Sequence, residues 1–123
     1  MTQLNIVGES RTFEEKVAAL PKERKAVYEQ LRAALNAKAK VNERLSKKYV
    51  TYNRGRELVA RISIIGQAVR IHFNLSKEDV AGKYAKFPLK DLGDRKVYEK
   101  VPYMLRLTSD LAVRRALQII EEI

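Results

Sequence analysis

The sequence predicts an α+β fold: a single domain with a mainly antiparallel sheet, and N-terminal helices and a C-terminal helix packed on one face. Apolar residues recur at helical spacing in 21–37 and again in 109–122, and they alternate with polar residues across 57–75. The length of 123 residues suits one domain. We therefore expect residues 1–11 to form an irregular arm and residues 12–123 to form one domain with helices against a sheet.

Two helices are expected ahead of the sheet. Thr12 can cap a short first helix whose opening turn carries two carboxylates, which suit the positive end of the helix dipole. Pro21 suits the first turn of a second helix, which we expect to run to about Ala37. The second helix has a one-sided apolar stripe made of Val27, Leu31, Ala34 and Leu35. The polar residues 38–44 are predicted to form a loop.

Three strands are predicted next, over 46–52, 57–65 and 68–75, because Tyr, Val, Thr and Ile are frequent there. Gly66 and Gln67 form a two-residue hairpin turn between the second and third strands. This register places apolar pairs on one side of the sheet: Ile64 with Val69, Ile62 with Ile71, and Ala60 with Phe73. It places polar pairs on the other side: Ser63 with Arg70, and Arg61 with His72. We expect the first side to be covered and the second to be solvated.

The C-terminal third is predicted to add one more strand and a last helix. Residues 76–82 and 87–94 read as short helical turns or loops, because glycine and proline interrupt them. Residues 103–108 alternate as a strand, and Ser109 can cap a helix that runs to about Glu122. The buried stripe of that helix consists of Val113, Ala116, Leu117 and Ile120.

The chain is strongly basic, with 25 Lys and Arg against 15 Asp and Glu and a net charge of +10. Residues 41–75 carry half of this excess, since they hold 7 basic and 2 acidic side chains, which gives +5. Such a field attracts polyanions. The alternative is that the charge only keeps the protein soluble.

Composition also bears on the compartment. The sequence has no cysteine, which fits a reducing cytoplasm and excludes disulfides and thiolate chemistry. Residues 1–10 lack the basic segment and apolar run of a signal peptide. No uncharged apolar stretch approaches the ~20 residues that a membrane span needs. We therefore expect a cytoplasmic protein with no membrane partner.

Cations and aromatic residues concentrate in the middle of the chain, where the charge excess lies. The guanidinium of arginine can form two hydrogen bonds to one phosphate, and the ring of Tyr49 or Tyr52 could stack on a base. The alternative is an ordinary solvated sheet face with one of these tyrosines in the core. The candidate nucleic-acid-binding residues are Lys47, Lys48, Tyr52, Arg54, Arg56, Arg61, Arg70 and His72.

A second group of aromatic residues and lysines lies between residues 83 and 103. These side chains could line a groove that grips a protein partner, or they could anchor a long loop on the core. The candidate partner-binding residues are Lys83, Tyr84 and Tyr98.

The sequence contains no catalytic motif. A lone histidine, His72, cannot form a two-histidine metal site, and no serine or aspartate spacing around it indicates a triad. The paired carboxylates have no nuclease spacing. We therefore expect no enzyme, no metal and no cofactor, although a pocket where Asp91, Asp94 and Arg106 meet would favour an enzyme or a small-ligand protein.

The chain resembles a family of small bacterial domains without assigned function, found alone or at the C-terminus of larger proteins. The resemblance covers about residues 12–120 and depends on several short motifs in order. These are Tyr49-x-x-Tyr52-x-x-Gly55-Arg56, Ile64-x-Gly66 with the strand that follows, Lys83-Tyr84, Asp91-Leu92, and Tyr98-x-x-Val101-Pro102 leading to Arg106. Lys47 departs from the pattern, which usually has an aromatic residue there. More remotely, the arrangement is similar to the YjbR-like group, which implies a double-wing α+β fold of DNA-binding type.

Together these features predict a non-enzymatic module that binds DNA or RNA through phosphate contacts, with little readout of bases. The alternative is a protein-interaction or accessory domain, and a weaker alternative is a small-ligand or enzymatic domain. The sequence leaves the oligomeric state open.

Overall fold

One antiparallel sheet of six strands organises the molecule, and its strand order is β1-β2-β3-β4-β6-β5. The computed structural model describes residues 11–123, so the predicted N-terminal arm lies almost entirely outside the described residues. The strands are β1 (Val41–Leu45), β2 (Val50–Arg54), β3 (Glu57–Ile65), β4 (Ala68–Phe73), β5 (Lys90–Asp91) and β6 (Tyr103–Leu107). The helices are α2 (Phe13–Ala18), α3 (Lys22–Asn36), α4 (Lys77–Ala81) and α5 (Asp110–Glu122), with a 3-10 turn, η1 (Lys96–Tyr98). The predicted α+β class is confirmed.

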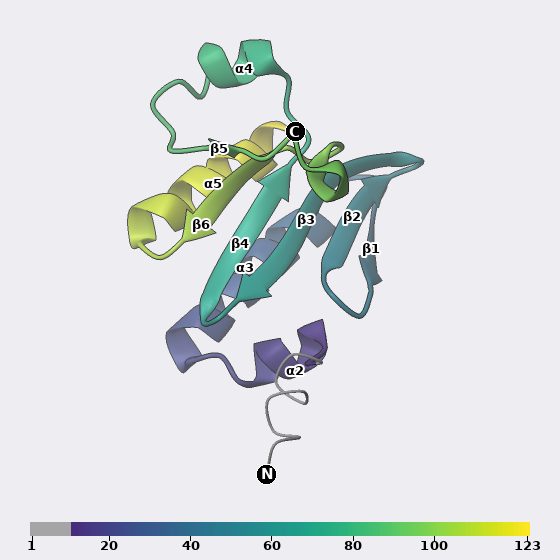
Figure 1. Cartoon of the computed structure of the whole chain (residues 1–123), viewed down its shortest axis with the longest axis vertical. Helices are drawn as coiled ribbons and strands as arrows, with labels where there is room; N and C mark the ends of the chain where they lie inside the picture. Colours follow the sequence, from purple (N-terminus) through teal and green to yellow (C-terminus); the bar gives the residue numbers. More distant parts are fainter. Residues whose placement is uncertain (1–10) are drawn as a thin grey trace.

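Helices α3 and α5 lie behind the sheet in Figure 1, whereas η1 lies in front of it. Their starts follow local sequence signals. Thr12 caps α2 in a capping box with Glu15, and the side chain of Ser109 caps α5 by accepting a hydrogen bond from the Ala112 amide. Pro21 immediately precedes α3, as expected for a helix start. Within residues 11–123, no helix combines the length and the apolar character that crossing a membrane requires.

The β3–β4 hairpin forms in the predicted register. Ile64 pairs with Val69, Ile62 with Ile71 and Ala60 with Phe73, and the turn falls at Gly66 and Gln67. Gly66 has φ 62, a left-handed conformation that glycine adopts readily. The apolar side of this hairpin is fully buried against α3 and α5. The core there includes Leu31, Leu35, Ile62, Ile71, Phe73, Leu105, Ala116 and Ile119.

Several parts of the sheet differ from the prediction: β4 ends at Phe73 rather than at residue 75, and Lys90–Asp91, predicted as part of a helical turn or loop, form the short strand β5. Residues 41–44, predicted as part of a loop, belong to the edge strand β1 (Val41–Leu45), which pairs with β2. Strand β2 begins at Val50 rather than at residue 46, because Ser46 turns the chain by hydrogen bonding to the Tyr49 carbonyl through its amide, at 2.9 Å. β1 was missed because Glu43 occupies a core-side position, where alternation requires an apolar residue.

The polar side of the β3–β4 hairpin is not solvated, which corrects the prediction. Arg61 is 8% exposed, Ser63 9% and His72 1%. The segment around η1 lies over these residues: Arg61 donates a hydrogen bond from Nη1 to the Val97 carbonyl at 2.7 Å, and the His72 ring stacks on Tyr98. The sequence pattern could not show this cover, because η1 begins 24 residues after His72 and 35 after Arg61 along the chain.

Candidate nucleic-acid interface

A hollow of about 440 Å³ opens on the front of the sheet. Its floor is the end of β3, and its walls come from α2, from the loop between β1 and β2, and from η1. The lining residues are Arg11, Lys16, Lys47, Lys48, Tyr49, Ser63, Ile64, Ile65, Val97 and Tyr98. We refer to this feature as the cationic hollow.

Backbone contacts bring these separate segments together. The amide of Phe13 in α2 donates to the Lys47 carbonyl at 2.7 Å, which joins the first helix to the β1–β2 loop. Phe13 is itself a core residue, 1% exposed, so α2 is anchored at this point. Lys16 reaches across to the sheet, where its Nζ lies 3.4 Å from the Ile64 carbonyl. Helix, loop and strand therefore form one surface around the hollow.

The part of the chain that the structure describes gives the hollow positive charge only. Four cationic side chains line it, from Arg11, Lys16, Lys47 and Lys48, and no aspartate or glutamate of residues 11–123 does. None of these four forms an ion pair with any residue in 11–123. Lys47 and Lys48 are exposed. A concave surface with one sign of charge concentrates anions at its opening.

Two tyrosine rings flank the hollow, and each has a cationic or aromatic partner on one side. The guanidinium carbon of Arg61 lies 4.2 Å from the centre of the Tyr49 ring, a cation–π arrangement. The imidazole of His72 stacks on Tyr98 with ring centres 4.7 Å apart and planes 7° from parallel. Both tyrosines are half-buried. These contacts fix the rings in place at the edge of the hollow.

Ser63 connects the floor of the hollow to the buried interior. Its Oγ lies 3.0 Å from Nε2 of His72. Burial, and the positive charges of Arg61 and Arg70, lower the pKa of His72 to about 4, so the imidazole is neutral at physiological pH. Nδ1 of His72 and Nε of both arginines are buried without a hydrogen-bond partner. Arg61 and Arg70 therefore carry positive charge behind the hollow and form no ion pair with another residue of the described range 11–123.

The structure brings together only part of the predicted nucleic-acid-binding set. Lys47 and Lys48 line the cationic hollow, and Arg61 lies directly behind Tyr49. Arg70 is half-buried on β4, beside the exposed Arg106 of β6. Arg54 and Arg56 lie at the far end of β2 and do not line the hollow; Arg54 contacts the carbonyl of Ile123 through Nη2 at 3.4 Å.

Tyr52 does not present its ring for stacking, which corrects that prediction. The residue is fully buried, and its hydroxyl donates to Oε2 of Glu43 at 2.6 Å. Burial and the neighbouring carboxylate raise the pKa of Tyr52. Of the two tyrosines that the sequence suggested for stacking, Tyr49 is the one at the surface.

The predicted partner-binding residues do not form one surface. Tyr84 is 2% exposed, and its hydroxyl donates to Oε1 of Glu122 at 2.6 Å, so this tyrosine anchors the loop after α4 on helix α5. Lys83 lies 3.8 Å from the same carboxylate oxygen. Tyr98 belongs to the cationic hollow. The reading of Tyr84 as a surface residue that grips a partner is therefore wrong.

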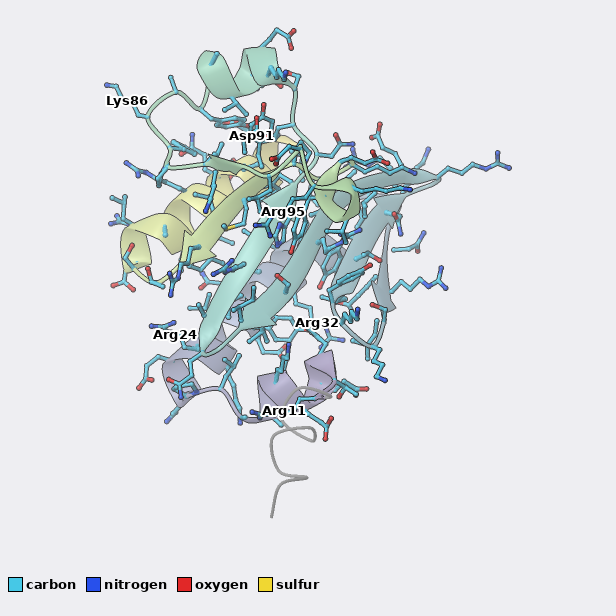
Figure 2. The ribbon with its side chains drawn as sticks, in the orientation of Figure 1. Arg11, Arg24, Arg32, Lys86, Asp91 and Arg95 are labelled. Carbon is cyan, nitrogen blue, oxygen red and sulfur yellow. The ribbon has the colours of Figure 1, made fainter. Side chains whose placement is uncertain are left out.

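The carboxylates that could have supported an enzyme do not meet the expected arginine. Asp91 and Asp94 line a separate hollow of about 500 Å³ together with Glu99, and Arg106 is not among its lining residues. Figure 2 shows Asp91 near the top of the sheet, away from Arg11 at the bottom. In residues 11–123 no group of three or more histidine, cysteine or acidic side chains is arranged to hold a metal ion.

Sequence reasoning missed Arg11, Lys16 and Ser63 as members of the site. Arg11 precedes the short helix α2 and Lys16 lies within it, and this segment contains no basic motif. Ser63 lies in the largely apolar strand β3. Their convergence depends on contacts across the fold, such as the Phe13–Lys47 hydrogen bond. The one local signal was the Lys47-Lys48-Tyr49 run, which does lie at the hollow.

The fold and the site define an α+β domain with a hollow lined by cationic side chains on the sheet face opposite α3 and α5. The model of a domain of unknown function, DUF5655, matches residues 13–122. The chain belongs to this family, which bears out the resemblance to an uncharacterised domain. No curated protein and no solved structure matches the chain significantly. The remote similarity to the YjbR-like group stays a prediction.

Proposed function

We propose that this domain binds nucleic acid through its phosphate backbone, with the cationic hollow as the contact surface. The observation that supports this most directly is that residues 11–123 supply four cations and no carboxylate to the lining of the hollow. Lysine and arginine side chains in such a position neutralise phosphates and release condensed counter-ions, which drives association. The net charge of +10 adds long-range attraction for a polyanion.

The proposal is tested by fluorescence anisotropy of labelled DNA and RNA oligonucleotides at low and near-physiological salt. The variant Lys47→Glu/Lys48→Glu reverses two exposed charges at the hollow. The matched control is Lys22→Glu/Lys86→Glu, which makes the same change in net charge at two exposed lysines that do not line the hollow. Figure 2 shows Lys86 at the opposite end of the molecule from Arg11.

We expect the first variant to lose binding at least about 100-fold, because two phosphate contacts become repulsive. We expect the control to lose only the small part that depends on net charge. Equal losses in both variants would mean that affinity depends on the net charge of the protein and not on the hollow. If the wild-type protein bound no oligonucleotide at low salt, the proposal would be overturned.

Reversal of Arg61 and Arg70, two of the candidate residues named from the sequence, does not serve this purpose. Arg61 is 8% exposed and holds the Val97 carbonyl, so a carboxylate at this position would disturb the cover over the sheet. A loss of binding in that variant would result from the disturbed structure and would not show that Arg61 or Arg70 contacts the nucleic acid.

A further inference from the structure

The concave shape of the cationic hollow is better suited to an unpaired nucleotide than to a duplex. Its volume of about 440 Å³ lies within the range of pockets that enclose small ligands. A duplex presents phosphates on a convex surface and keeps its bases stacked inside. An unpaired nucleotide can place its phosphate and its base in a concave site together.

The two tyrosines are suited to contact a base. Each ring has one side against the protein, since Arg61 lies 4.2 Å from the centre of Tyr49 and His72 lies 4.7 Å from that of Tyr98. Both residues nevertheless line the hollow. Rings that are already held lose little freedom when a ligand binds, and an aromatic side chain stacks on any base with little sequence preference.

The floor offers a directed hydrogen-bond donor. His72 is neutral, and its Nδ1 is buried without a partner. Because a buried N–H without an acceptor is rare in folded proteins, we assign the tautomer with a lone pair on Nδ1 and the proton on Nε2. In that tautomer Nε2 donates to Oγ of Ser63, 3.0 Å away, and the serine's own hydroxyl hydrogen is available to the hollow. Serine hydroxyls are common donors to phosphate oxygens.

From these three features we infer, on the basis of the proposed function, that the cationic hollow takes an unpaired nucleotide, so that the partner is single-stranded nucleic acid. Lys16, Lys47, Lys48 and the Ser63 hydroxyl contact the phosphate of this nucleotide and those of its neighbours along the strand. The base packs on the tyrosine rings at the edge of the hollow.

The first test compares a labelled single-stranded 12-mer with a blunt hairpin duplex that carries the same number of phosphates, for the wild-type protein. We expect the single strand to bind at least about five-fold more tightly, which is the lower end of the effect of one stacked base. Equal affinities, with both lost in Lys47→Glu/Lys48→Glu, would overturn this inference and leave the proposed function standing. No binding of either probe would overturn both.

The second test uses paired variants of the hollow. Tyr98→Leu should lose the preference for the single strand, whereas Tyr98→Phe, which keeps the ring, should retain it; the duplex affinity should be the same in both. Tyr49→Leu provides an independent measurement if Tyr98→Leu proves unfolded by circular dichroism. Ser63→Ala should weaken single-strand binding about ten-fold, the value of a hydrogen bond to a charged group. An unchanged preference in the two leucine variants would overturn the inference.

Discussion

At the scale of single residues, Glu43 shows how this fold accommodates a charge on the core side of a strand. Burial opposes ionisation of this carboxyl group. Hydrogen bonds from Arg32, Tyr52 and Asn36 more than compensate, and they lower its pKa below the usual range. Arg32 Nε contacts both carboxylate oxygens, at 2.9 and 3.1 Å, and Asn36 lies at 3.2 Å. The network attaches the edge strand β1 to helix α3.

Tyr52→Phe tests whether Tyr52 is structural. The change removes the 2.6 Å hydrogen bond to Glu43 and leaves the ring in the core. We expect the free energy of unfolding to fall by about 1.5–3 kcal/mol, the range for a hydrogen bond to a charged group, as measured by urea denaturation. Oligonucleotide binding should not change. A large loss of binding with no loss of stability would restore the stacking role that the sequence suggested.

His72 should make stability depend on pH above the range in which carboxylates titrate. Its pKa is about 4 in the folded protein and about 6.5 in the unfolded chain. The unfolded state therefore binds the proton more readily, and stability is fully present above pH 6.5 and falls as the pH drops towards 4. Between pH 7.5 and 5 we expect a loss of about 2 kcal/mol, measured by urea denaturation at each pH.

The control for this pH dependence is His72→Gln, which keeps a polar group near Ser63 but has no proton to gain. Its stability should stay nearly constant between pH 7.5 and 5, even if it is lower throughout. A wild-type protein that loses nothing over this range would show that the imidazole is not buried as described.

At the scale of elements, the β3–β4 hairpin is determined by residues that are close together in the sequence. Gly66 adopts φ 62, and a Cβ added there would have no atom within 4 Å, so only the backbone conformation opposes a side chain. We expect Gly66→Ala to lower the free energy of unfolding by about 1–2 kcal/mol, the cost of the left-handed conformation. Gln67→Ala, at the neighbouring exposed turn position, should change it by less than about 0.5 kcal/mol. Thermal or urea unfolding of the two variants provides the comparison, and equal effects would contradict the turn geometry.

This hairpin also marks how far the sequence alone could predict the structure. Its register follows from a two-residue turn and from alternation, both local in sequence, and the caps at Thr12 and Ser109 are local as well. The strand β1 was not predictable in this way, because Glu43 takes its partners from α3 and β2. The burial of Arg61 and His72 depends in the same manner on η1, which packs over them from far along the chain.

At the scale of the whole molecule, the two faces of the sheet differ in polarity and charge. The face against α3 and α5 is apolar and forms the core. On the opposite face, neighbouring strands place two cations, Arg70 and Arg106, directly opposite each other. Like charges directly opposite on a sheet are destabilising, so this face keeps an unfavourable charge distribution in the folded protein. An anionic ligand would relieve it.

Salt dependence measures how many phosphates the molecule engages. For a single-stranded oligonucleotide, the logarithm of the binding constant should fall linearly with the logarithm of salt concentration, with a slope of about −0.7 for each phosphate neutralised. The four cations of the hollow then predict a slope near −2.8. In Lys47→Ala/Lys48→Ala the slope should become shallower by about 1.4, while Lys22→Ala/Lys86→Ala leaves it unchanged. If the slope shifted equally in both variants, binding would depend on the net charge of the protein and not on particular cations. The phosphates would then not bind in the hollow between α2, β3 and η1.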